Sequence, residues 1–121
     1  MIVFKELSYK IIGAAMEVYN ELGKGFLEKV YENSLMVMFE SLKIKAVQQA
    51  PIKVYFKSQI VGNYIADILV EDKIILELKI VDKITDVHKA QALNYLKATG
   101  LKLAIILNFK NNSLEYERVV L

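Results

Sequence analysis

The segment YIADILVEDKIILELK, residues 64–79, constrains the fold more than any other part of the sequence. On both sides of residues 71–73 the even-numbered positions are apolar. These positions are Ala66, Ile68, Val70, Ile74, Leu76, Leu78 and Ile80. Because successive side chains of a strand point to opposite faces, this alternation predicts two hairpin strands that share one continuous apolar face.

Two helices are expected before this hairpin and one after it. Apolar residues recur at helical spacing over residues 5–22, which end at Gly23, and over residues 26–42. The apolar sets are Leu7, Ile11, Ala14, Ala15, Val18 and Leu22 in the first helix, and Val30, Leu35, Met38 and Leu42 in the second. A third helix is expected over residues 85–98, with Thr85 as its N-cap and Gly100 just past its end.

The remaining segments are typical of strands. IKAVQQ and PIKVYF are expected to form two strands before the hairpin, LKLAIILNF a strand buried on both faces, and LEYERVVL a more polar final strand. The expected order is two helices, four strands, one helix and two strands. A helix that connects two strands of one sheet makes those strands parallel. The prediction is therefore a single α/β domain over residues 1–121, with a mixed β-sheet flanked by helices.

Composition excludes several classes of site. The chain has no Cys, which excludes disulfides and thiolate metal sites, and its single His argues against zinc. No apolar run reaches the roughly 18 residues of a membrane span, and charged residues come too early for a signal peptide. We therefore expect a soluble, cytoplasmic protein that does not bind membranes. A net charge of +2 permits an anionic partner without demonstrating one.

Two acids and a lysine occupy odd positions of the hairpin, opposite in parity to the apolar set. They are Asp67, Glu77 and Lys79. Residues directly opposite in an antiparallel pair point the same way, so Asp67 and Glu77 share a face only if the connection has an odd number of residues. A connection of three residues, 71–73, meets this condition. A bend or bulge near Asp67 is an alternative way to bring the two acids together.

Two carboxylates about 5 Å apart across a strand pair suit a hard divalent cation such as Mg²⁺ or Mn²⁺. Lys79 lies on the same face, where it could steady a water molecule or a developing negative charge. Phosphodiester hydrolysis needs such a combination of metal, water and cation. The alternative is an ordinary surface face with a cross-strand ion pair.

The third helix adds a polar stripe. His88, Gln91 and Tyr95 lie at offsets 0, 3 and 7, on one side of the helix. Gln91 and Tyr95 could face a phosphate or a water molecule. The alternative is a half-buried polar stripe, and for His88 this is the better interpretation because no second His or catalytic triad accompanies it.

The stretch GFLEKVYE, residues 25–32, places Glu28, Tyr31 and Glu32 on one face at the start of the second helix. This face is either solvated or part of a site. With Gly25, it also resembles the signature of the GxxExxY protein family. Two further motifs resemble the PD-(D/E)XK nuclease superfamily, which has a restriction-endonuclease-like fold. They are Asp67 … Glu77-Leu78-Lys79 for the D…ExK core and Gln91-x-x-x-Tyr95 for the QxxxY motif.

The resemblance implies a role for each matching residue. Asp67 and Glu77 would bind Mg²⁺, with the Leu78 carbonyl and Glu28 as further ligands. Lys79 would orient or activate the attacking water, and Gln91 and Tyr95 would position the water or the phosphate. Glu28 and Tyr31 would then face the site while Glu32 is solvated. Ala66 stands where the superfamily name has Pro, a residue that makes no metal contact.

The leading hypothesis is therefore a metal-dependent nuclease acting on DNA. The second is a non-catalytic nucleic-acid-binding or assembly subunit on the same fold. The third is an α/β domain with a scattered polar face, in which Glu28, Asp67 and Glu77 do not converge. With 121 residues there is no room for a separate recognition domain, so sequence preference would come from a homo-oligomer or a protein partner.

Overall fold

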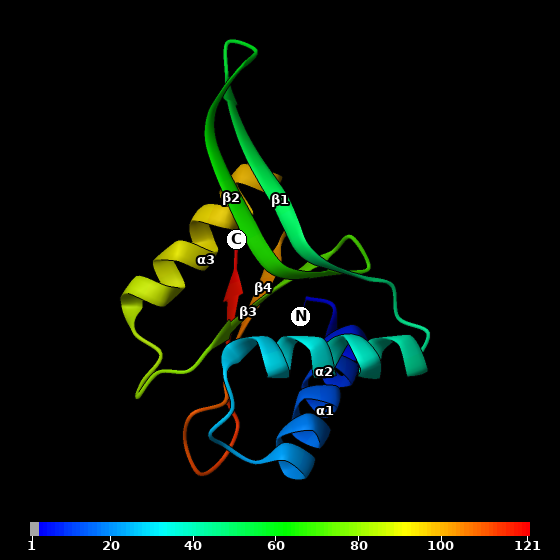
Figure 1. The fold of residues 1–121 in the computed structure, drawn as a ribbon. Helices are drawn as coiled ribbons and strands as arrows, with labels where there is room; N and C mark the ends of the chain where they lie inside the picture. Colours follow the sequence, from blue (N-terminus) through cyan, green and yellow to red (C-terminus); the bar gives the residue numbers. More distant parts are fainter. Residues whose placement is uncertain (1–2) are drawn as a thin grey trace.

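The computed structural model describes residues 3–121, which form a five-stranded sheet between two layers of helices (Figure 1). The elements in chain order are α1 (Lys5–Leu22), α2 (Glu28–Ser41), β1 (Ala46–Phe56), β2 (Gln59–Val70), β3 (Ile74–Lys79), α3 (Asp86–Thr99), β4 (Leu103–Asn108) and β5 (Glu115–Val120). No helix in this range is long and apolar enough to cross a membrane.

The sheet is mixed, with the strands in the order β1-β2-β3-β4-β5. Only β3 and β4 are parallel, and α3 connects them. This confirms the α/β fold class. The predicted strand count is wrong by one, because IKAVQQ and PIKVYF lie in the single strand β1. Pro51 is accommodated there because β1 is an edge strand, where a missing N–H need not break a ladder.

Each face of the sheet has its own core. On one face α1 and α2 cover side chains of β2, β3 and β4 that include Ile68, Leu76 and Ile105. On the other face α3 packs Ala92 and Leu96 against the sheet. As predicted, β4 is buried on both faces along its whole length.

The apolar face of the hairpin is not continuous, which corrects the prediction. Ile68 packs under α1 and α2, whereas Ala66, also an even position, packs under α3. β1 changes face in the same way between Ala46 and Ala50. The change occurs where the ladder skips a pair and Gln49 takes a left-handed conformation, with φ 51°. The bend considered near Asp67 is therefore present.

The buried face of α2 also differs from the prediction. Tyr31, Leu35 and Phe39 are fully buried, whereas Val30 and Leu42 are exposed. The ring of Tyr31 stacks on Phe109 at a centroid distance of 4.4 Å. This aromatic contact determines which side of α2 faces the sheet. The spacing of apolar residues alone predicts a neighbouring side of the helix.

Candidate active site

Asp67 and Glu77 lie at adjacent positions where β2 and β3 separate. The register pairs Val70 with Ile74 across the three-residue connection, and the ladder ends at Ile68 and Leu76. Counting one step further places Asp67 opposite Glu77 on the same face. The predicted odd connection is confirmed.

Side chains replace the backbone ladder at this point. The N–H of Asp67 donates to Glu77 Oε2 at 2.9 Å, and the N–H of Leu78 donates to Asp67 Oδ2 at 2.7 Å. Each carboxylate thus accepts one hydrogen bond from the opposite strand through a single oxygen. The second oxygen of each carboxylate takes no part in these two bonds. The two acids are held side by side by the backbone rather than by a counter-charge.

Both acids have raised pKa values. Burial, followed by the charge of Asp67, raises the pKa of Glu77 to about 7, and the side chain is only 4% exposed. Burial also raises the pKa of Asp67, against the hydrogen bond from Leu78, and the charge of Glu32 adds to the increase. The positive charge of Lys79 opposes both increases. The pair therefore favours a bound proton or a cation.

Lys79, which follows Glu77 on β3, contacts α3. Its Nζ donates to Gln91 Oε1 at 3.3 Å, and Gln91 Nε2 donates to the hydroxyl of Tyr95 at 3.1 Å. Burial and the charge of Glu77 raise the pKa of Tyr95. The structure thus brings Lys79, Gln91 and Tyr95 together beside the two acids.

Glu28 is the one expected carboxylate ligand that does not converge with Asp67 and Glu77 in residues 3–121. It is exposed at the first turn of α2. Burial raises its pKa, and the charges of Asp67 and Lys79 also act on it. Yet within residues 3–121 no three acidic, His or Cys side chains lie close enough to hold a metal ion. Two of the three expected carboxylates therefore converge, and the third lies in their electrostatic range.

The predicted orientations of Tyr31 and Glu32 are wrong. The hydroxyl of Tyr31 donates to the carbonyl of Gly23 at 2.6 Å and accepts from the N–H of Phe26 at 3.3 Å, so it fastens the joint between α1 and α2. Gly25, in the same joint, has φ 108°, a conformation that favours glycine. In this stretch Gly25 and Tyr31 therefore support the chain, and Glu28 is the residue whose charge interacts with those of Asp67 and Lys79.

Glu32 is 3% exposed, rather than solvated, and belongs to a polar cluster that sequence reasoning missed. It accepts hydrogen bonds from Gln48 at 2.5 Å, Gln49 at 2.9 Å and Lys29 at 2.9 Å. The bend at Gln49 brings this cluster close enough to act on the pKa of Asp67. Two consecutive Gln residues inside an apolar strand were the available signal.

His88 caps α3. This agrees with the expectation that His88 has a structural rather than a catalytic role. Its Nδ1 accepts a hydrogen bond from the N–H of Thr85 at 3.0 Å. Thr85 is the N-cap and Gly100, with φ 76°, ends the helix, as predicted. The cap orients α3 and so places Gln91 opposite Lys79.

Known proteins share the sequence pattern that builds this arrangement. The family model of the PD-(D/E)XK nuclease superfamily matches residues 5–119, which include every site residue described above. The chain belongs to this superfamily.

A solved structure has a similar fold. The crystal structure of SSO0001 superimposes with a TM-score of 0.57 at 16% identity, over 77% of this chain and 50% of that one. The chain thus spans half the length of SSO0001, and at this identity the likeness shows the fold alone. A search of curated proteins found no significant match.

PD-(D/E)XK nucleases typically use divalent metals, and among residues 3–121 no group of three metal-binding side chains is formed. Mg²⁺ is bound through one or two carboxylates and completes its shell with water and substrate phosphate. Asp67 and Glu77 supply two carboxylates, and their raised pKa values reflect a need for positive charge that a cation meets. The number and type of donor groups in the pair are thus compatible with Mg²⁺.

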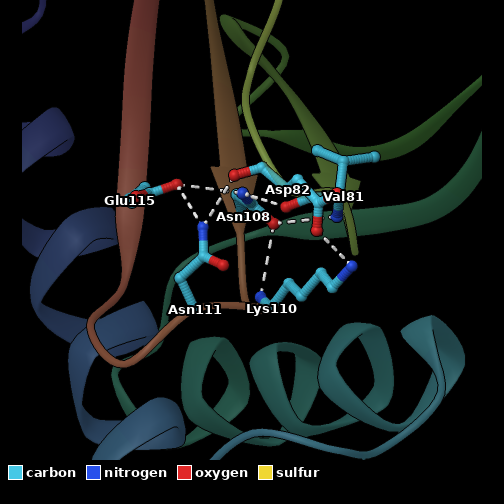
Figure 2. A network of polar contacts seen from close by, with 6 residues as sticks. All are labelled: Val81, Asp82, Asn108, Lys110, Asn111 and Glu115. Atoms are coloured by element: carbon cyan, nitrogen blue, oxygen red, sulfur yellow. Dashed lines mark hydrogen bonds and ion pairs between the residues drawn. The ribbon is translucent and has the colours of Figure 1, made fainter.

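A buried asparagine fixes the chain where it leaves this PD-(D/E)XK core (Figure 2). Asn108, on β4 opposite Lys79, accepts from the N–H of Val81 at 3.1 Å and donates to the carbonyl of Val81 at 2.8 Å. It also donates to Glu115 on β5 at 3.0 Å. Asn108 therefore holds the segment between Lys79 and α3 in place, and Glu115 in turn holds Asn108.

Proposed function

We propose that the protein is a metal-dependent nuclease that hydrolyses phosphodiester bonds in DNA, and that it is a GxxExxY-type member of its superfamily. The observation that supports this most is the interlocked pair Asp67 and Glu77 beside Lys79. Two carboxylates that form no ion pair in the described residues, with the Lys79 ammonium nearby, match the needs of phosphodiester hydrolysis.

Asp67 and Glu77 would hold Mg²⁺ or Mn²⁺, with the Leu78 carbonyl and Glu28 as the further donors. When bound, the ion polarises the phosphate and lowers the pKa of a coordinated water. Glu28 is exposed at a helix start, so its side chain has room to turn toward the pair. Glu32 adds negative charge without offering a ligand, because three side chains already hold it.

The chain's own residues do the remaining work. Lys79 carries the positive charge that orients an attacking water and stabilises the charge developing on the phosphate. Gln91 holds the Lys79 amine through Oε1 and the Tyr95 hydroxyl through Nε2, which fixes their spacing. Because the pKa of Tyr95 is raised, its hydroxyl stays protonated and can donate to a phosphate oxygen.

A second candidate function has one observation in its favour. Three acids do not converge in the part of the chain described, so a non-catalytic nucleic-acid-binding or assembly subunit is also consistent with the fold. Against it, two adjacent carboxylates repel a phosphate backbone unless a cation lies between them. Metal binding therefore separates the two functions.

The test is cleavage of end-labelled single- and double-stranded DNA in Mg²⁺, Mn²⁺ or EDTA. The variants are Glu77→Gln and Lys79→Met, and the matched controls are Glu40→Gln and Lys83→Met, which change exposed residues outside the site. We expect metal-dependent cleavage that falls at least about a hundredfold in the two site variants and is unchanged in the controls.

Undiminished cleavage by Glu77→Gln would contradict the proposed site. Absence of cleavage, together with no effect of either metal on thermal stability, would favour the non-catalytic function. Thermal melting of each variant without metal shows whether the fold survives the substitution.

A further inference from the structure

The outer part of the β1–β2 hairpin stands apart from the rest of the sheet. We name residues 50–66 the hairpin arm. β2 pairs with β3 only over residues 68–70, so within the arm each strand has only the other as a neighbour in the sheet. Figure 1 shows the arm extending past α3, with its tip beyond the other strands. The tip is a tight turn at Lys57 and Ser58, both with positive φ.

The arm exposes large apolar side chains that no described residue covers. Tyr55 and Phe56 are 61% and 62% exposed. Ile60, Val61 and Ile65 are exposed on the partner strand. These side chains cover little of the core, so burial in the described fold does not explain them.

The arm and the residues just before it carry positive charge only. Residues 41–66 contain four lysines and no Asp or Glu, in a chain whose net charge is only +2. Lys53 and Lys57 lie in the arm, and among residues 3–121 neither forms an ion pair. Lys57 Nζ lies 5.6 Å from the centre of the Phe56 ring. Cationic and aromatic groups thus occur together at the tip.

The base of the arm reaches the candidate active site. The ring of Tyr64 lies 5.3 Å from that of Tyr95, whose hydroxyl accepts from Gln91. Three residues after Tyr64 comes Asp67. A chain lying on the face of the arm that carries Tyr64 would therefore lead toward the candidate active site.

We infer that the hairpin arm binds single-stranded nucleic acid across both of its faces, stacking bases on Tyr55 and Phe56, which are consecutive residues of β1 and lie on opposite faces, and contacting phosphates with Lys53 and Lys57. This inference rests on the proposed nuclease function and names the substrate form that the site receives. Exposed aromatic faces stack on unpaired bases, which a duplex keeps buried, and lysines supply the attraction to phosphate.

The charge distribution favours nucleic acid over a second copy of the chain. A symmetric contact between two arms would place Lys53 and Lys57 against the other copy's arm, which carries the same lysines. Residues 41–66 contain no carboxylate to neutralise them. A polyanion meets both the lysines and the aromatic rings at once.

The test measures binding in EDTA, where metal-dependent cleavage cannot occur. A fluorescein-labelled single-stranded oligonucleotide and the corresponding duplex are titrated with the wild type, Tyr55→Ala/Phe56→Ala and Lys53→Gln/Lys57→Gln. The matched control is Lys5→Gln/Tyr9→Ala, because Tyr9 is 64% exposed and Lys5 Nζ lies 5.9 Å from its ring. Thermal melting and sedimentation velocity accompany each titration.

We expect the aromatic double variant to bind the single strand at least about tenfold more weakly, and the control to bind like wild type. The lysine double variant should reduce the slope of log K against log salt by about 1.4, the value for two single-strand phosphate contacts. Melting temperatures should not change, because these side chains are exposed.

Three outcomes would overturn this inference alone. One is wild-type affinity in both arm variants, and another is equal weakening of duplex and single-strand binding. The third is a wild-type dimer that the aromatic variant converts to monomer, which would assign the arm to a second copy. If the wild type cleaves DNA with metal while the arm variants bind and cleave normally, the inference fails and the nuclease function stands. A wild type that neither binds nor cleaves nucleic acid overturns both.

Discussion

The N–H of Asp67 donates to Glu77 Oε2 at 2.9 Å, and Asp67 in turn accepts at 2.7 Å from Leu78, the residue after Glu77. In a regular ladder these N–H groups would bond to carbonyls across the strand pair. Here carboxylates take that place, so the backbone itself holds two acids together in a largely buried position. Without a cation the arrangement costs free energy, and that cost is measurable.

The metal-free protein should become more stable as the pH falls from about 8 to about 5. The pKa of Glu77 is raised from 4.5 to about 7, so the folded state binds this proton more tightly than the unfolded state. Its stabilising contribution is complete below about pH 4.5 and is lost as the pH rises through about 7. The pKa values of Asp67 and Glu28 move in the same direction. The difference should be on the order of 3 kcal/mol.

Urea unfolding in EDTA across this pH range measures the effect. Glu77→Gln should be more stable than wild type near pH 8 and should show a flatter pH dependence. Glu40→Gln changes an exposed acid and should follow the wild type. A wild-type stability that rises with pH over this interval would show that Glu77 is not held as described.

Mg²⁺ or Mn²⁺ should stabilise the fold, and more so at alkaline pH, because protons compete for the same carboxylates. A metal concentration about a hundred times Kd corresponds to about 2.7 kcal/mol of stabilisation. Asp67→Asn or Glu77→Gln should abolish the shift in Tm, whereas Glu28→Gln should only reduce it, because Glu28 does not converge with the pair. An equal loss in all three variants would instead make Glu28 a full ligand.

The sequence predicted the centre of the site because parity along a hairpin is a strong constraint. A three-residue connection places Asp67 and Glu77 on one face, and the adjacent helix carries Gln91 and Tyr95. Local signals also predicted the ends of α1 and α3, where Gly23 and Gly100 have positive φ. These features depend on residues close together in the sequence.

The errors concern long-range contacts. Residue spacing on α2 could not show that Tyr31 would stack on Phe109, a residue 78 positions away. Burial of Glu32 depends on Gln48 and Gln49, which reach it only because β1 bends. The same bend moves Ala66 to the other core. Period-two alternation assumes a straight strand and fails where the strand changes face.

Tyr31→Phe should destabilise the fold by about 1–2 kcal/mol without reducing catalysis, because the hydroxyl serves the Gly23 carbonyl rather than the site. Gly25→Ala should cost about 1 kcal/mol, since φ 108° is unfavourable for alanine. Urea unfolding gives both values, with Tyr9→Phe as the exposed control. Normal stability of Tyr31→Phe combined with lost cleavage would place the hydroxyl in the reaction.

Asn108→Ala should destabilise the protein by about 2 kcal/mol, because it leaves the partly buried N–H and carbonyl of Val81 without their partner (Figure 2). Asn108→Asp should be at least as harmful, since the new carboxylate would face both the Val81 carbonyl and Glu115. Asn20→Ala, on the exposed side of α1, is the matched control and should cost little.

Because Asn108 fixes the segment between Lys79 and α3, its loss should also slow cleavage at temperatures where the variant remains folded. Lys79 is the last residue of β3 and Gln91 lies in α3, so the segment connects the elements that carry them. Their 3.3 Å contact therefore depends on the conformation of that segment. The measurement is kcat and KM for a labelled oligonucleotide. A lower kcat with KM unchanged supports this, and unaltered kcat in the folded variant would show that the Lys79–Gln91 contact forms without the Asn108 clamp.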